Sequence, residues 1–207
     1  MVRKLLMRNE KMQPKSDTTQ PTLTFKFIHS NKKLLKTIHP LCTKFIKEIP
    51  FYTGFEWKDK EIVIYEKQDL IYDAVVDCNR KIYIKNLRDE AAYTIYILLH
   101  ELIHLNLMDV ITKLKSFPLL KKGHTRREAL VSLLVKKLLI KTLGKKVFLK
   151  VKEIDIKKYS LHKLMWEKAE ELEKKYILNR KKDVSFLSLS KKIVYFSPNP
   201  LGFLHEV

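Results

Sequence analysis

The residues LLHELIHL at positions 98–105 decide the fold of this chain. His100 and His104 are four residues apart, so on a helix their side chains lie on the same face, one turn apart. Two imidazoles placed in this way can bind one Zn²⁺ at about 2.0–2.1 Å. Glu101 directly follows the first histidine, and its carboxylate can accept a proton from a water whose pKa the metal has lowered. The spacing therefore predicts a zinc site that activates water for hydrolysis.

The helix that carries this motif has a second interpretation. An apolar helix can contain two histidines and a glutamate by chance and simply be buried. Burying three polar side chains without partners costs free energy, however, and that cost favours a metal site. The motif also comes directly after a strand-turn-strand pattern, which a chance match does not require.

The segments around the motif predict a mixture of helices and strands. The apolar run predicts a helix over residues 90–108, followed by a connection over 109–124. Pro50 is expected to end the first helix and Pro40 to kink or split it, while Gly144 is expected to stop the third. We expect the other helices over 31–49, 125–142 and 160–179, strands over 22–28, 61–66, 73–78 and 81–85, a strand and turn over 51–59, and a short strand or extended link over 145–151.

The motif and the segment GHTRREALV at 123–131 together resemble the gluzincin class of zinc metallopeptidases, in particular the minigluzincin-like and ImmA-IrrE-type peptidases. In that class a helix bearing HExxH is followed, some twenty or more residues later, by a helix that supplies a glutamate ligand. Glu128 lies 24 residues after His104, and EALVSLL at 128–134 looks like the opening of that second helix. The resemblance covers residues 55–140 and implies a Zn²⁺ held by His100, His104 and Glu128.

Three alternatives to the assignment of Glu128 as the third ligand stay open: a capping role for Glu128 itself, and two other candidate ligands. Thr125 and Glu128 also fit a capping box, in which both side chains only satisfy the first turn of a helix. His124 could instead complete a three-histidine site, which would resemble the SprT-type zincins that act on proteins attached to DNA. The HGxxF/W-like continuation of that class is missing, because Thr-Arg-Arg follows His124. Asp109 is a weaker candidate, and Glu128 is favoured.

These observations together predict an α+β fold that is zincin-like. A small mixed sheet should pack on the motif helix and on a following Glu-bearing helix, with a helical C-terminal part. We expect a flexible tail over 1–20, a catalytic domain over 21–150, and a C-terminal helix and tail over 151–207 packed on the same domain. The expected activity is hydrolysis of peptide bonds in a protein or peptide substrate, with Glu101 as general base. The alternatives are a DNA-associated SprT-like protease and a non-catalytic zincin-fold binding module, and the intact Glu101 argues against the latter.

Other segments are candidates for supporting roles. The strand Lys81–Lys85 could be an edge strand that holds an extended substrate, or an ordinary half-buried strand. Tyr159 and His162 could stabilise an oxyanion, although helix packing is the more common role of such residues. The apolar pieces of the tail over 184–207 either lie over the cleft or complete the core.

The chain is strongly basic, with 42 Lys and Arg against 23 Asp and Glu and a net charge of +19. Such a charge can attract nucleic acid, or it can reflect lysines spread over an ordinary surface. The lysines are densest over 136–182, which lacks the aromatic interleaving expected of a single-strand binding groove. Nucleic acid is therefore a partner that the sequence allows but does not favour.

Two cysteines, Cys42 and Cys78, are too few for a disulfide framework and predict free thiols in a reducing compartment. The N-terminal residues lack the apolar stretch of about 7–15 residues that a signal peptide needs. No run reaches the roughly 18 apolar residues of a membrane-spanning helix. We therefore expect a soluble, cytoplasmic protein.

Overall fold

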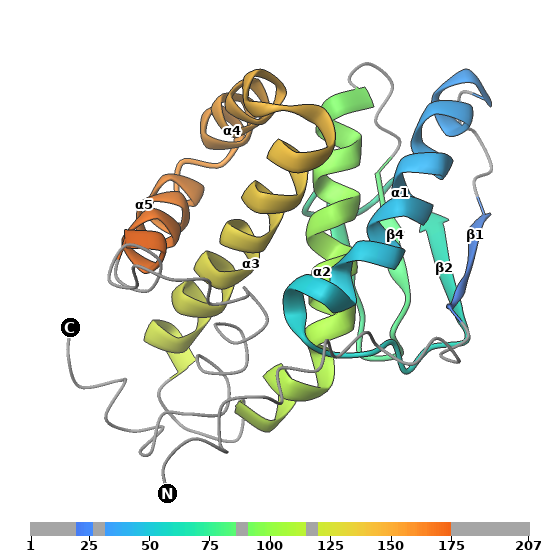
Figure 1. The fold of residues 1–207 in the computed structure, drawn as a ribbon, viewed down its shortest axis with the longest axis horizontal. Helices are drawn as coiled ribbons and strands as arrows, with labels where there is room; N and C mark the ends of the chain where they lie inside the picture. The colour runs from blue at the N-terminus through green and yellow to red at the C-terminus, as the bar shows by residue number, and fades with distance from the viewer. Residues whose placement is uncertain (1–19, 27–31, 86–90, 115–119, 175–207) are drawn as a thin grey trace, which may run out of the picture.

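The computed structural model of the chain describes residues 20–26, 32–85, 91–114 and 120–174, without the side chains of residues 109–126 (Figure 1). Five helices and four strands lie in this described part, which confirms the predicted α+β class. No helix among the described residues is both long enough and apolar enough to cross a membrane. The elements are β1 (Thr22–Lys26), α1 (Lys32–Thr53), β2 (Glu61–Glu66), β3 (Ala74–Val76), β4 (Ile82–Ile84), α2 (Ala91–Leu114), α3 (Leu120–Leu143), α4 (Lys145–Lys158) and α5 (His162–Glu173).

The described strands form a small mixed sheet in the order β1-β2-β4-β3. The pairs β1–β2 and β2–β4 are parallel, and the hairpin pair β3–β4 is antiparallel. Of the two interpretations of Lys81–Lys85, an edge strand or an ordinary half-buried strand, the edge strand is wrong, because β4 lies between β2 and β3. Ile82 and Ile84 are both buried, which suits an internal position, and β3 forms an edge of the sheet among the described strands.

One face of the sheet packs on α1 and α2, and the part of the molecule beyond α2 consists of helices. Ile62 and Ile64 of β2 alternate with more exposed neighbours and belong to the same apolar core as α1 and α2. Figure 1 shows α2 near the centre, with α1 and the sheet on one side of it and α3, α4 and α5 on the other. The motif helix therefore lies inside the molecule, between the sheet and α3.

Helix α1 runs through both of its prolines, so the prediction that Pro50 ends it is wrong. Proline at position 50 has no N–H for the carbonyl of Ile46, four residues earlier. The indole Nε1 of Trp57 donates to that carbonyl at 2.7 Å instead, and this bond replaces the missing one. The helix ends after Thr53, where Gly54 adopts a φ of 78° that suits glycine. Residues 51–53 are thus helical and 54–60 form no strand, contrary to the strand and turn predicted over 51–59.

The connection predicted over 109–124 is also wrong, because α2 continues to Leu114 and α3 begins at Leu120. Thr125 therefore lies inside α3 and cannot cap its start, so the capping-box interpretation of Glu128 no longer applies.

The segment predicted as a strand or link over 145–151 is the first half of α4. The buried positions of α4 are Phe148, Val151 and Asp155, which recur at the three- and four-residue spacing of a helix. Gly144, at a φ of 88°, separates α3 from α4. Two predicted tails, over 1–20 and 184–207, lie outside the described residues except for residue 20. The same holds for positions 27–28 of the strand predicted over 22–28 and for positions 175–179 of the helix predicted over 160–179.

Candidate metal centre

Polar contacts on one side of α2 set its position against the rest of the fold. The side chain of Asn106 donates to the carbonyl of Phe55 at 3.0 Å and accepts from the hydroxyl of Thr53 at 2.6 Å. Arg80 forms a two-point ion pair with Asp59 at 2.6 and 2.7 Å, and it also donates to the carbonyl of Leu105 at 3.2 Å. The residues on the other side of α2 are then held facing α3.

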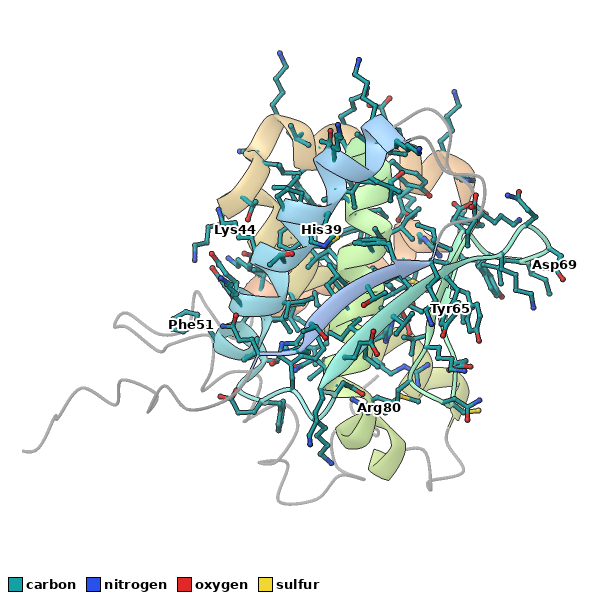
Figure 2. All side chains as sticks on the ribbon, turned by 90° about the vertical axis from the view of Figure 1, so that its right-hand side faces the viewer. His39, Lys44, Phe51, Tyr65, Asp69 and Arg80 are labelled. Carbon is teal, nitrogen blue, oxygen red and sulfur yellow. The ribbon has the colours of Figure 1, made fainter. Side chains whose placement is uncertain are left out.

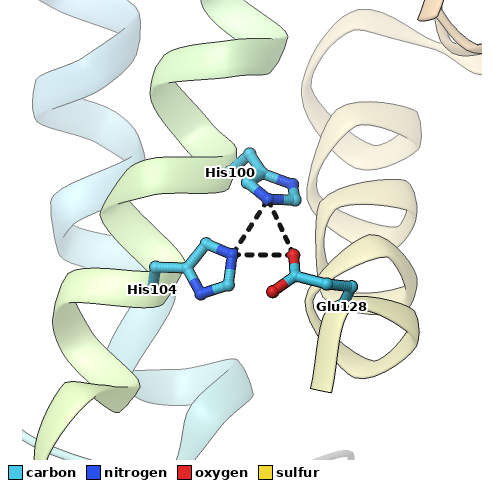
Figure 3. A group of neighbouring side chains, drawn as sticks. All are labelled: His100, His104 and Glu128. Carbon is cyan, nitrogen blue, oxygen red and sulfur yellow. Dashed lines mark hydrogen bonds and ion pairs between the residues drawn. The ribbon is translucent and has the colours of Figure 1, made fainter. Parts of the chain in front are cut away.

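Three side chains meet between α2 and α3 (Figure 3). His100 Nε2 and His104 Nε2 are 2.9 Å apart, and Glu128 Oε2 lies 3.3 Å from the first and 3.0 Å from the second. The side chains of His100, His104 and Glu128 are 17%, 16% and 9% exposed, so the group is sheltered but open to solvent on one side. These residues form a cluster that could hold a metal ion.

The geometry of the three donor atoms fits a small divalent ion. Tetrahedral coordination at about 2.0–2.1 Å requires donor atoms about 3.3 Å apart, and the three observed separations fall at or slightly below this value. Two imidazole nitrogens and one carboxylate oxygen are also a donor set that zinc accepts. No described residue hydrogen-bonds to the buried Nδ1 of His100. The polar contacts of this ring, with His104 and Glu128, are made by its Nε2.

The electrostatics of Glu128 suit a metal ligand. Burial raises the pKa of its carboxyl, but hydrogen bonds and charge interactions with His100 and His104 oppose this and leave the pKa well below its usual range. Glu128 is therefore an anion when it faces the imidazoles. Its other oxygen, Oε1, accepts from Arg127 Nε at 3.3 Å, so one oxygen faces the histidines while the other is held from behind.

Glu101 lies near this cluster and near Val76 of β3, because the charges of His100 and Glu128 and the backbone of Val76 all act on its carboxyl. Burial raises the pKa of its carboxyl to about 7, with the charge of His100 and a backbone hydrogen bond from Val76 lowering the pKa and Glu128 raising it. A cation bound by the cluster would lower this raised pKa of Glu101 and favour its anionic form. The residue is buried next to the ligand cluster, as a base acting on a nearby water requires.

No protein-family model, curated protein or solved structure matches the chain. The gluzincin resemblance therefore stays a prediction. The cluster of His100, His104 and Glu128 is a property of the described side chains and does not depend on it.

The structure brings some of the candidate residues together and separates others. The side chains of His124 and Asp109 lie outside the described residues, so these two alternatives stay untested. His162 Nδ1 lies 3.0 Å from an oxygen of the buried Asp155, which also accepts from Trp166 at 2.9 Å. Tyr159 is close to Asp73, and the described contacts of Tyr159 and His162 do not include the three donor atoms. Their oxyanion role stays a prediction.

Arg127 is the functional candidate that the sequence did not reveal. Residues one apart on a helix do not normally face each other, so its contact with Glu128 has no signal in the spacing. The guanidinium orients the carboxylate that faces the histidines, which is the role of an outer partner in many metal sites.

We expect Arg127→Gln to weaken zinc affinity by about 10–100-fold while the melting temperature of the metal-free protein changes little. The reason is that the glutamine cannot hold the distant oxygen of Glu128 with a charged hydrogen bond. Competition with a chromophoric zinc chelator gives the affinity. An affinity equal to that of the parent would mean that Arg127 does not orient the ligand.

Proposed function

We propose that this protein is a zinc-dependent metallopeptidase, with His100, His104 and Glu128 as the metal ligands and Glu101 as the general base. The observation that carries the proposal is the triangle of two imidazole nitrogens and one carboxylate oxygen, with separations of 2.9–3.3 Å. Glu101 next to this triangle adds the group that hydrolysis needs and that a purely structural zinc site does not.

The roles of the chain's own residues follow from their positions. A zinc ion in the triangle supplies Lewis-acid chemistry, which lowers the pKa of water and polarises a carbonyl group. The carboxylate of Glu101 accepts a proton from the attacking water and later gives it to the leaving amine. Arg127 keeps the carboxylate of Glu128 in a fixed orientation.

The edge strand β3 supports a peptide substrate over a small molecule. The carbonyl of Asp73 accepts a hydrogen bond from Lys85 N–H, and Asp77 N–H donates to the carbonyl of Lys81; Lys81 and Lys85 directly flank β4. Backbone groups alternate in direction along a strand, so those of Ala74 and Val76 face away from β4. The backbone of Val76 lies close enough to Glu101 to lower the pKa of that carboxyl, which places this edge beside the proposed general base. An extended peptide added along β3 by backbone hydrogen bonds would therefore pass beside Glu101.

We expect the purified protein to hold about one zinc ion per chain, as a site with three protein ligands does, and to cleave unfolded casein. A chelator should abolish cleavage, and added zinc should restore it. Elemental analysis and gel electrophoresis of the digest measure the two properties on one sample.

Two outcomes would contradict this proposal in different ways. Failure to retain any divalent metal after zinc is added back would remove the metal site itself. Retention of zinc without cleavage of any unfolded protein would leave a metal-binding module and remove the peptidase activity.

A further inference from the structure

The face of the sheet that turns away from α1 and α2 carries a row of side chains across all four described strands. The strand register places Lys26 beside Tyr65, Tyr65 beside Tyr83, and Tyr83 beside Val75. These residues alternate with the buried isoleucines of β2 and β4, so they point to the opposite face. Figure 2 views the molecule from this side and labels Tyr65.

The two tyrosines at the centre of the row form a stacked pair surrounded by lysines. Their ring centroids are 5.4 Å apart and their planes differ by 25°. Lys26 Nζ and Lys81 Nζ lie 5.4 and 5.7 Å from the ring of Tyr65, and Lys67 Nζ lies 6.0 Å from the ring of Tyr83. We call these five residues the tyrosine–lysine face.

The positions of the lysines follow from the strands. Lys67 lies two residues after Tyr65, and Lys81 lies two residues before Tyr83, so the two cations flank the row on either side. Lys26 stands at the end of the row. All three lysines are exposed, whereas both tyrosines are half-buried.

Nearby carboxylates only partly offset this positive charge. Lys67 lies 3.9 Å from Asp69, but both side chains are at least half exposed, so the pair is weak. Glu61 shares the face but lies four residues from Tyr65, about 13 Å along the strand. Glu61 also accepts a hydrogen bond from Thr24 at 2.7 Å, so it is engaged away from the row.

We propose that the tyrosine–lysine face binds single-stranded nucleic acid. Two near-parallel rings leave two outer faces on which unpaired bases can stack, and the three lysines around them can pair with phosphates. Stacking on a base is a stronger contact than an exposed cation–π contact, so a base can displace an ammonium group from the ring. The displaced ammonium group is then close to the phosphate of the same nucleotide.

Two features of the molecule favour this partner. The chain carries a net charge of +19, which attracts polyanions from a distance. The aromatic pair then adds what charge alone does not supply, namely a preference for bases that are not already paired and stacked. The face lies on the other side of the sheet from His100 and His104, so the inference goes beyond the proposed peptidase activity and does not depend on it.

The test is the binding of a fluorescently labelled (dT)₁₅ and (rU)₁₅ to the full chain, followed by fluorescence anisotropy over a range of salt concentrations. We expect the triple variant Lys26→Gln, Lys67→Gln, Lys81→Gln to bind weakly and to show a salt slope smaller by about 2, since each lost phosphate contact removes about 0.7. Tyr65→Leu with Tyr83→Leu removes two stacking surfaces, so it should lose at least about 30-fold in affinity and keep the salt slope of the parent. Tyr65→Phe with Tyr83→Phe keeps both rings and should bind like the parent.

The matched control is the triple variant Lys145→Gln, Lys146→Gln, Lys157→Gln, which removes the same charge from exposed positions of α4. It should change the affinity less than twofold. Equal losses in the two triple variants would reduce the binding to net charge and overturn the proposal. Parent-like binding by the leucine variant would also overturn it. So would binding of poly-glutamate as tight as that of the oligonucleotides, with the same affinity in the parent and in the leucine variant. Melting curves identify any variant that fails to fold, and the exposed lysine variants keep the test valid in that case.

Discussion

Replacing Glu101 with glutamine is expected to leave zinc bound and to slow peptide hydrolysis by at least about 100-fold, the lower end of what a general base contributes. Glutamine has nearly the same shape as glutamate but cannot accept the proton of the attacking water. The carboxyl is buried beside the ligand cluster and does not belong to it, so its replacement should not disturb the metal. Elemental analysis and the rate of casein cleavage, measured on the same preparation, check both parts.

The matched control for this variant is Glu167→Gln, which changes an exposed glutamate of α5. It should behave like the parent in both measurements. Cleavage by Glu101→Gln at the parent rate would show that another group acts as the base. Loss of zinc from the same variant would instead assign Glu101 to the coordination of the metal.

Replacing Glu128 with alanine is expected to lower zinc affinity by more than the roughly 10–100-fold that the loss of an outer partner costs, and to abolish hydrolysis. Two histidines alone would then remain, whereas catalytic zinc sites normally use three protein ligands. Because Glu128 lies well inside α3, its removal does not take away a helix cap. The variant thus tests the metal contact and not the start of the helix.

Thermal unfolding with and without zinc measures this effect directly. Zinc at a hundredfold excess over its Kd stabilises a folded protein by about 2.7 kcal/mol, which raises the melting temperature of a chain of this size by roughly 5–10 °C. The parent should show this rise and Glu128→Ala should not.

Glu173→Ala is the matched control, because it removes a partly buried glutamate that pairs with Lys136 and Lys137 of α3. It should keep the full rise with zinc even if its metal-free melting temperature falls. A normal rise in Glu128→Ala would remove Glu128 from the ligand set and direct attention to His124.

The helices and strands show where local sequence patterns suffice and where they fail. The alternation in residues 61–66 and the apolar run around the motif predicted β2 and most of α2, because both patterns depend on neighbours within a few residues. The local pattern misplaces the end of α1. Pro50 offers no N–H to the carbonyl of Ile46, and the donor that replaces it is the indole of Trp57, which lies beyond the helix. Propensity alone cannot reveal such a partner.

The tyrosine–lysine face is a second case of this kind. The sequence directed attention to the lysine-rich segment 136–182, where only a few aromatic residues lie between the lysines. The face combines residues from β1, β2 and β4 with Lys67 and Lys81 at the strand ends, and it exists only because the sheet order places those strands side by side. Strand order depends on long-range pairing, which no local period encodes.

The sequence by itself determined which side chains share a face of one element, above all His100 and His104 on α2, because helical spacing is a local property of the backbone. Only the tertiary structure decided which elements meet. The packing of α3 against α2 brings Glu128 to 3.0 Å from His104, and the same contact places Arg127 behind its carboxylate. The pairing of β3 with β4 alone decided which strand forms the edge beside Glu101. These contacts join residues far apart in the chain, and their energies depend on packing and burial that arise only when the whole core has formed.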